Sequence, residues 1–444
     1  MTVSQKVCLG FLAVITVGTI LLMMPFSTSS ATWNDPIVAL FTSTSAVCVT
    51  GLGVVDTGTY FSFWGQLFIA LLVQIGGLGY MTTTTFLILL IGRRFDLRQK
   101  IAIQQTLDRP GMQGSAQIIR SIIATTLIFE ITGIFLLLPA FVPDFGWSRG
   151  LWIAIFHSIN GWNNAGFSLF SDNLIKYQSS FLVVCVMTGL LIFGGIGYQV
   201  ILDTYIWLRE TLQKRQLKLV FSLDFKVATS TTVILLILGT IAFFLVELKN
   251  PATLGSHNLR EKILLAWFQS ATTRTAGFNT IDIGKMTTAG LFITIALMFI
   301  GASPGGTGGG IKTTTLRVLT SCTKAILQGK EEVLLYERKI AVPLILKAVG
   351  VLIGSVTTVI IATILIAITD PELSFIQLLF EVVSAFATVG LSTGITGSVS
   401  ASAKLILIVV MYIGRVGVLL FMSAILGDPR PTNIHYPEEN LLVG

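Results

Sequence analysis

The sequence predicts an all-α membrane protein built from four tandem repeats of a helix, a re-entrant loop and a second helix. The chain has 444 residues, of which 53% are hydrophobic and only 11% are charged, whereas soluble domains carry about 25% charged residues. Apolar stretches of about 20 residues, long enough to span a bilayer, alternate with shorter apolar runs that end in a glycine-containing turn. These turns recur at a nearly constant spacing, which indicates one structural unit used four times.

One glycine in each turn defines the repeat. Gly51, Gly166, Gly277 and Gly390 follow one another at intervals of 115, 111 and 113 residues. The intervals place the repeats at approximately 1–100, 101–220, 221–340 and 341–427 of a single transmembrane pore domain, with a polar tail at 428–444.

Eight stretches are predicted to span the membrane, two in each repeat. The first helices are expected at 7–26, 119–142, 227–248 and 343–368, and the second helices at 64–92, 181–208, 287–327 and 404–426. The apolar runs between them, such as 152–159, are too short to cross and suit half-helices of re-entrant loops. Irregular backbone at membrane depth is tolerated only against protein or water. Four such segments therefore favour one shared central pore with pseudo-four-fold symmetry.

The net charge of +7 follows from the loops between repeats. Lysine and arginine gather in 92–120, 207–228 and 312–347, whereas 25–64 has none. Because basic loops stay in the cytoplasm, we expect both termini and the inter-repeat loops there, with the re-entrant segments entering from outside. Five basic residues in 247–290 depart locally from this rule. The positive charge thus needs no nucleic acid partner, and anionic lipid is a candidate partner for the basic loops.

Catalytic and metal-binding patterns are not found in the sequence. The four cysteines and three histidines are dispersed, which argues against a disulfide framework and against a zinc or haem site. The first apolar stretch lacks an Ala-x-Ala cleavage pattern and is interpreted as a spanning helix. We therefore expect a protein that is not an enzyme.

The glycine turns have the composition of a cation path. Glycine permits backbone angles that aim successive carbonyl oxygens inward, and rings of carbonyls replace the hydration shell of a cation. The C-terminal ends of half-helices entering from outside also favour a cation. The candidate filter residues are Val49, Thr50, Gly51, Asn164, Ala165, Gly166, Thr275, Ala276, Gly277, Thr388, Val389 and Gly390. Asp56, Asp172 and Asp282 follow three of the turns and either enrich cations at the mouth or are solvated loop residues.

The turn sequences VTGL, NNAGFSL, RTAGFNT and ATVGLSTG resemble the four pore signatures of the Trk/Ktr/HKT potassium transporter superfamily. The resemblance covers essentially the whole chain and is closest to KtrB-type membrane subunits. It implies that the four glycines form one potassium filter in a bacterial plasma membrane, with K⁺ as the transported ion and Na⁺ as a candidate activator. It further implies a homodimer, with the 428–444 tail as a candidate dimer contact, and a cytosolic RCK/KTN-type regulatory ring subunit. ATP or ADP would then act only through that partner.

The second helix of the third repeat contains a break that an ordinary helix cannot accommodate. Its candidate gate residues are Gly301, Ser303, Pro304, Gly305, Gly306, Thr307, Gly308, Gly309 and Gly310. Glycine costs about 1 kcal/mol and proline about 3 kcal/mol in a helix interior, so this segment should line a cavity. A phosphate-binding loop is rejected because Ile311 separates Gly310 from Lys312. The resemblance implies an intramembrane gating loop below the filter. Milder breaks are expected at Gly76–Gly77, Gly194–Gly195 and Gly414.

Four further charged residues are predicted to lie in or near the membrane. Arg415 is interpreted as an electrostatic barrier held by the loop, or alternatively as an ion-pair partner of Glu381. Arg274 is expected to hold a pore helix from behind. Glu130 and Asp203 receive no role.

The predicted function is channel-like potassium uptake. A sodium- or proton-coupled potassium symporter remains the alternative, although such transporters usually have inverted repeats and buried acidic relays. A membrane-embedded enzyme or receptor would need a convergent polar site, which the sequence does not indicate.

Overall fold

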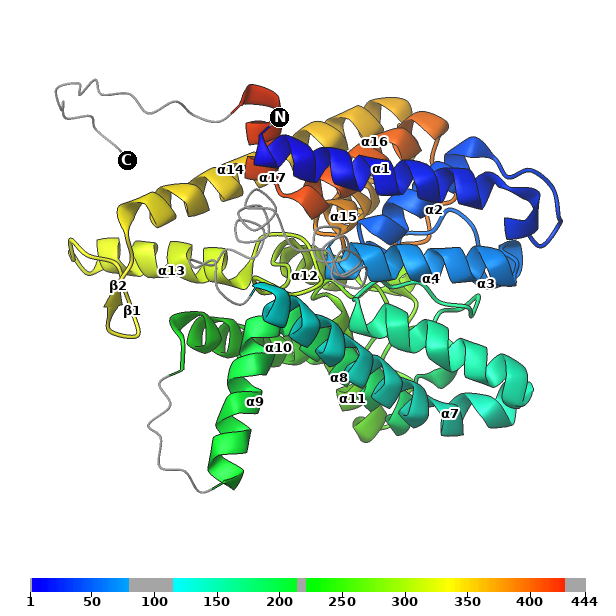
Figure 1. Cartoon of the computed structure of the whole chain (residues 1–444), viewed down its shortest axis with the longest axis horizontal. Coiled ribbons are helices and arrows are strands. Elements are labelled where there is room, and N and C mark those ends of the chain that lie inside the picture. Colours follow the sequence, from blue (N-terminus) through cyan, green and yellow to red (C-terminus); the bar gives the residue numbers. More distant parts are fainter. Residues whose placement is uncertain (1, 80–114, 214–220, 428–444) are drawn as a thin grey trace.

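The computed structural model describes residues 2–79, 115–213 and 221–427. Each repeat begins with a long apolar helix (Figure 1): α1 (Val3–Met23), α7 (Ser115–Trp162), α10 (Leu223–Glu247) and α14 (Val342–Thr369). Helix α7 is two helices in one, because its backbone is non-helical at Gly146, where φ is 77°. Its first half is the spanning helix of the second repeat, and its second half is the pore helix.

The pore helices are short and each ends directly before one of the glycine turns. They are α2 (Pro36–Val47), the second half of α7, α11 (Leu259–Thr272) and α15 (Phe375–Phe386). Asp35 and Asn258 cap the N-termini of α2 and α11 and accept hydrogen bonds from amides that have no partner inside the helix, and Ser374 is the N-cap residue of α15. The half-helices expected from the sequence are therefore confirmed.

The second helix of each repeat is broken. The segments are α4 (Phe63–Leu78), α8 (Phe181–Ile196) with α9 (Tyr198–Leu212), α12 (Thr288–Phe299) with α13 (Thr313–Leu327), and α16 (Ala401–Val416) with α17 (Val418–Leu426). The α8–α9 pair bends by 104° and the α16–α17 pair by 98°. Helix α4 ends at Gly79, beyond which residues 80–114 lie outside the described chain.

The breaks expected at Gly76–Gly77, Gly194–Gly195 and Gly414 were wrong by two to three residues. The bends occur at Gly197 and Gly417, with φ of 99° and 92°, and α4 ends at Gly79 with φ of 78°. Such angles are easily accessible only to glycine. Gly76, Gly194 and Gly414 are instead helical residues that allow close packing.

That packing joins the second helix to the pore helix of the same repeat. A Cβ added at Gly76 would lie 2.2 Å from the backbone oxygen of Val47, at the end of α2. The corresponding distances are 1.9 Å from Gly194 to Trp162 and 1.8 Å from Gly414 to Phe386. Each of these three glycines lies 14 residues after the serine that caps the N-terminus of its helix. The same spacing, counted from the threonine that caps α12 in the third repeat, leads to Gly301.

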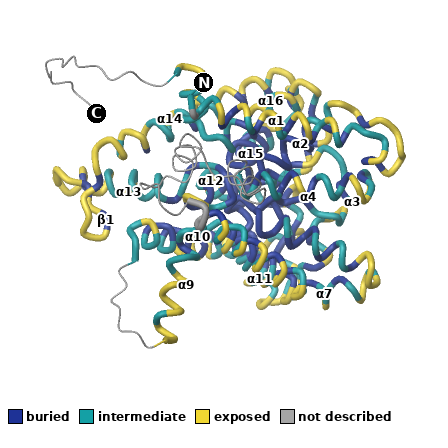
Figure 2. Tube along the Cα trace, viewed as in Figure 1, coloured by how far each residue is buried: buried dark blue, intermediate teal, exposed yellow. Residues whose placement is uncertain are grey.

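The four repeats close into a ring. Helix α4 contacts α7, α8 contacts α11, α12 contacts α15, and α16 contacts α2, so that each second helix packs on the next repeat's pore-helix element. Figure 2 shows buried residues at the centre of this ring and exposed residues around its periphery. The peripheral residues include large apolar side chains, such as Phe135, Leu238 and Ile368, as expected for a surface that faces lipid.

In the described residues, four helices are long and apolar enough to cross a membrane, or up to six when each bent pair counts as one span. The expected second spans of the first and third repeats are not among them. The first leaves the described chain after Gly79, and the third is interrupted between Phe299 and Thr313.

Short elements complete the described chain. They are η1 (Pro25–Ser27), α3 (Thr57–Tyr60), η2 (Ile175–Tyr177), η3 (Ile283–Lys285) and an antiparallel hairpin of β1 (Leu334–Leu335) and β2 (Arg338–Lys339). The hairpin joins α13 to α14, and Val333, Leu335 and Ile340 pack with Val227 of α10 in a small apolar cluster. The sequence-predicted tail at 428–444 and most of the basic segment 92–120 lie outside the described residues.

Candidate cation pathway

The four glycines predicted from the repeat meet in a closed ring. A Cβ added at Gly51 would lie 2.2 Å from the backbone oxygen of Ala165, which precedes Gly166. The distance from the added Cβ to the backbone oxygen of the next turn is 3.1 Å from Gly166 to Ala276, 2.5 Å from Gly277 to Val389, and 2.1 Å from Gly390 back to Thr50. Each glycine thus touches the next repeat's turn, and the fourth touches the first. Four segments separated by more than 100 residues in sequence therefore surround one axis.

The backbone of the four turns follows one pattern. The residue two positions before each glycine has a positive φ: 57° at Val49, 56° at Asn164, 64° at Thr275 and 51° at Thr388. The four glycines also have positive φ, between 71° and 91°. The residue that separates the two positions in each turn does not have a positive φ. The φ angle thus changes sign from one residue to the next, and a backbone of this kind can direct successive carbonyl oxygens toward an ion.

The pore helices hold these turns by matched but not identical bonds. The amide of Gly51 donates to the hydroxyl of Ser45 at 3.0 Å, and that of Gly390 donates to Ser384 at 3.1 Å. Both serines lie six residues before their glycine. Asn160 and Ala271 occupy the same position in the second and third repeats, so the four-fold symmetry is approximate in its side chains.

Buried polar side chains brace the outer ends of two turns. Glu381 of α15 accepts hydrogen bonds from the Ser392 hydroxyl, from the Thr393 amide at 3.0 Å and from the Thr396 hydroxyl at 2.9 Å. His157 of α7 holds the matching position in the second repeat, and its Nε2 lies 3.0 Å from the Ser168 hydroxyl. Both residues lie nine positions before a ring glycine, a shared spacing from which their support of the turns was not predicted.

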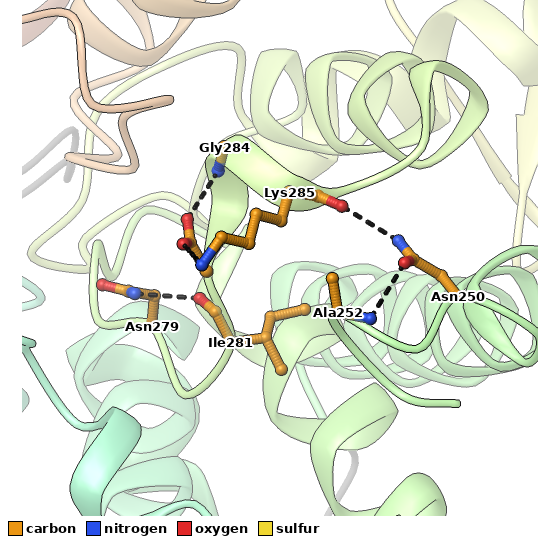
Figure 3. Close-up of polar contacts among 7 residues, drawn as sticks. Asn250, Ala252, Asn279, Ile281, Gly284 and Lys285 are labelled. Atoms are coloured by element: carbon orange, nitrogen blue, oxygen red, sulfur yellow. Dashed lines mark hydrogen bonds and ion pairs between the residues drawn. The ribbon is translucent and has the colours of Figure 1, made fainter. Parts of the chain in front are cut away.

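The outer segment of the third turn is held by a chain of contacts (Figure 3). Asn279 donates to the backbone oxygen of Ile281 at 2.9 Å, and the Lys285 ammonium lies 3.0 Å from the Asp282 carboxylate. Asn250, after α10, donates to the backbone oxygen of Lys285 at 2.9 Å. Asp282 also caps η3, as Asp56 caps α3. These two carboxylates therefore have local capping roles, and no such side-chain role is seen for Asp172 in the described chain.

The predicted break of the third repeat is a loop directly below the glycine ring. Gly301 is the third-repeat counterpart of Gly76, but it does not pack on a pore helix. The space beside it is filled by the loop itself, since a Cβ added at Gly301 would lie 2.0 Å from the backbone oxygen of Gly309. The loop bonds to the second repeat: the amides of Ser303 and Thr307 donate to the oxygens of Gly195 and Gly194 at 3.0 and 3.1 Å. In return, the Tyr198 amide donates to Gly305 at 3.1 Å.

Arg415 ties this loop to two other repeats. Its guanidinium donates to the backbone oxygen of Thr307 in the loop and to that of Gly76 in the first repeat. The interpretation in which the loop holds Arg415 therefore agrees with its contacts. The alternative pairing with Glu381 is wrong, because Glu381 is bonded to Ser392, Thr393 and Thr396 on the outer side of the turn.

A second cation at the loop was missed by sequence reasoning. The Lys312 ammonium donates to the backbone oxygen of Gly308 at 2.7 Å, one residue beyond the carbonyl that Arg415 contacts. Lys312 is also the N-cap residue of α13. The signal for this contact is a lysine two residues after the glycine-rich segment, close enough to reach its carbonyl oxygens.

Arg274 contacts the loop rather than the pore helix expected. It precedes Thr275 in the third turn, is 9% exposed, and donates through Nη2 to the backbone oxygen of Gly301 at 2.9 Å. In the other three repeats, the corresponding glycine packs directly on its pore helix. The long Arg274 side chain spans the additional distance created by the inserted loop.

The two charged residues without a predicted role have structural partners. Glu130 of α7 accepts a hydrogen bond from Asn163 at 3.2 Å, and the same amide group donates to Gln74 of α4 at 2.9 Å. This network joins the first two repeats behind the second turn. Asp203 of α9 accepts from Gln199 and from Ser222, which caps α10.

The ring of turns, the lipid-facing periphery and the loop below define a membrane pore protein of the four-repeat, re-entrant-loop class. A family model described as "Cation transport protein", TrkH, matches residues 1–428. The chain therefore belongs to the TrkH family, whose members are membrane ion transporters and not enzymes.

Similar proteins extend over nearly the whole chain. Ktr system potassium uptake protein B of Bacillus subtilis (strain 168) is 38% identical, with 100% of this chain and 97% of that protein covered. The protein of the same name from Vibrio alginolyticus is 40% identical and covers 99% and 94%. The potassium/sodium uptake protein NtpJ of Enterococcus hirae is 35% identical and covers 99% and 97%.

Structural comparison confirms the fold. The potassium transporter TrkH from Vibrio parahaemolyticus superposes with a TM-score of 0.72 at 20% identity, covering 95% of this chain and 85% of that one. The predicted fold class and the resemblance to the Trk/Ktr/HKT superfamily are thus confirmed.

Proposed function

We propose that the chain takes up potassium through the glycine ring, selectively and down its electrochemical gradient. The observation that carries this proposal is the closed contact of Gly51, Gly166, Gly277 and Gly390 with one another's turns. Potassium is favoured among cations because relatives at 38% and 40% identity are named potassium uptake proteins. An inside-negative potential supplies about 2.3 kcal/mol per charge for each 100 mV.

Carbonyl oxygens provide the chemistry for this selection. The positive φ values at Val49, Asn164, Thr275 and Thr388 turn the backbone so that consecutive oxygens share one direction. These neutral dipoles replace water around a weakly hydrated cation without binding it too tightly to leave. The pore helices end at the turns, and their partly negative C-termini add a favourable field.

The direct test is ion selectivity in proteoliposomes. Gly51→Ser should raise sodium permeability relative to potassium, measured by uptake or reversal potential in both ions. If selectivity is unchanged in Gly51→Ser and also in the serine variants of Gly166, Gly277 and Gly390, the ring is not the filter.

Coupling to a second ion is the alternative, and one observation favours testing it. The relative NtpJ is named a potassium/sodium uptake protein. Flux should therefore be measured with no imposed sodium or proton gradient. Potassium flux that persists without both gradients supports a channel-like pore, whereas strict dependence on either gradient supports a symporter. Sodium that accelerates flux without being required would act as an activator.

We further propose that the Gly301–Gly310 loop is a gate. Three contacts support this: Arg415 holds its Thr307 oxygen, Lys312 holds its Gly308 oxygen, and Gly194 accepts from its Thr307 amide. A loop below the filter that is tied to several repeats obstructs the path until those bonds exchange. Deleting Thr307 to Gly309 should raise potassium flux in a chain that still inserts and purifies as the parent does.

The regulatory assembly belongs to the same proposal. A homodimer in a bacterial plasma membrane, with both termini cytoplasmic and the 428–444 tail at its interface, agrees with the resemblance to Ktr-type subunits. The name "Ktr system" borne by relatives is consistent with a partner subunit. We propose an RCK/KTN-type ring that senses ATP and ADP and acts through α13, which leads directly from the loop.

A further inference from the structure

The loop does not only lie below the filter; it is hydrogen-bonded to it. Thr388, two residues before Gly390, is fully buried, and its Oγ1 accepts a hydrogen bond from the backbone amide of Gly309 at 2.9 Å. A Cβ added at Gly309 would lie 2.5 Å from the same oxygen. Glycine is therefore the residue that allows the loop backbone to reach the filter hydroxyl.

The third repeat supplies a hydroxyl at the same position with a different contact. Thr275 lies two residues before Gly277, and a Cβ added at the neighbouring loop residue Gly308 would lie 1.8 Å from its Oγ1. Yet Thr275 Oγ1 has no hydrogen-bond partner in the described part of the chain. The two threonines therefore both touch the loop, but only Thr388 is bonded to its backbone.

We propose that Thr388 interlocks filter and gate, because the loop amide and a potassium ion at the inner end of the filter compete for the electron density of its hydroxyl oxygen. This inference rests on the proposed role of the loop as a gate. A hydroxyl has two acceptor lone pairs, and the Gly309 amide takes one of them in the closed arrangement. Loop closure thus withdraws oxygen density from the inner ion position.

The interlock has a reciprocal consequence. If loop closure weakens binding of the inner cation, binding of that cation must weaken loop closure by the same factor. Potassium arriving at the inner end of the filter therefore favours release of Gly309. The loop senses occupancy of the filter as well as any force transmitted through α13.

The test compares Thr388→Val with Thr275→Val, each in the full-length chain and in the chain lacking 307–309. Both substitutions remove a hydroxyl from the same filter position at similar volume, so their shared effect on conduction cancels in the flux ratio. Loss of one net hydrogen bond corresponds to roughly a two- to ten-fold change in an equilibrium. We expect Thr388→Val to give a two- to ten-fold higher potassium flux than Thr275→Val with the loop present, and a ratio near one without it.

The possible results separate the two proposals. The interlock is overturned if the ratio of Thr388→Val flux to Thr275→Val flux is the same with and without residues 307–309. The gate proposal then still stands, provided that the deletion itself raises flux. A deletion that leaves flux unchanged overturns the gate and the interlock together. Thr388→Ser, which keeps the acceptor oxygen, should raise flux less than Thr388→Val does when the loop is present. A rise equal to that of the valine variant would contradict the interlock.

Discussion

Glu381 and Ser392 are hydrogen-bonded across the fourth filter turn, from nine residues before Gly390 to two residues after it. His157 and Ser168 form the same connection around Gly166 at 3.0 Å. In the first and third repeats these pairs of positions hold Thr42 with Gly53 and Phe268 with Asn279. The outer ends of opposite turns, the second and the fourth, are thus held by side chains that the other two lack.

The brace at Glu381 should be necessary for selectivity. Glu381→Gln keeps the shape but removes acceptor capacity from a group bonded to Ser392, Thr393 and Thr396. We expect a loss of about 1–3 kcal/mol in stability and a higher relative sodium permeability, measured by thermal unfolding in detergent and by uptake in both ions. Glu372→Gln, at an exposed position before α15, is the control. Equal behaviour of the two variants would contradict the brace.

The four filter glycines should differ in their tolerance of alanine. An added Cβ lies 2.1 Å from the next carbonyl oxygen at Gly390 and 2.2 Å at Gly51, but 3.1 Å at Gly166. Gly390→Ala and Gly51→Ala should therefore lower potassium uptake more than Gly166→Ala does. Uptake kinetics at matched expression provide the measurement. An equal loss in all of them would show that positive φ, which the four share, dominates over the steric contact.

Arg415 should act both by its charge and by its two bonds. Arg415→Ala removes the contacts with the Thr307 and Gly76 oxygens, so we expect flux to rise, although less than after loop deletion. Arg415→Lys keeps the charge, but an ammonium lacks the planar fork of a guanidinium. If charge alone forms the barrier, the lysine variant will match the parent. If bridging matters, it will lie between the parent and the alanine variant.

A nucleotide-sensing partner should alter flux through the loop. A partner can shift a gate only by binding the open and closed forms with different affinity. Co-purification from the native membrane, followed by flux with ATP and with ADP, tests this. A chain that purifies alone and whose full flux is indifferent to both nucleotides would be an autonomous channel. Deletion of 307–309 should abolish any nucleotide effect that the parent shows.

The sequence by itself determined the class of the protein and the position of its glycine ring. Composition and the spacing of Gly51, Gly166, Gly277 and Gly390 were sufficient, because a repeated unit must use its glycines in equivalent places. The break at Gly301–Gly310 was also evident, since proline and clustered glycine are incompatible with a continuous helix. Side-chain partners carry no such period, so the sequence could not assign them.

The tertiary structure decided what those partners are and where the helices bend. Breaks were expected at Gly76–Gly77, Gly194–Gly195 and Gly414, but Gly76, Gly194 and Gly414 pack against pore-helix carbonyls, and Gly197 and Gly417 bend the chain instead. The role of a glycine depends on its backbone angle and on the atom that faces it, and the residue type alone gives neither. For the same reason, Arg415 was separated from Glu381, and Thr388 was joined to Gly309, only when the four repeats closed around one axis.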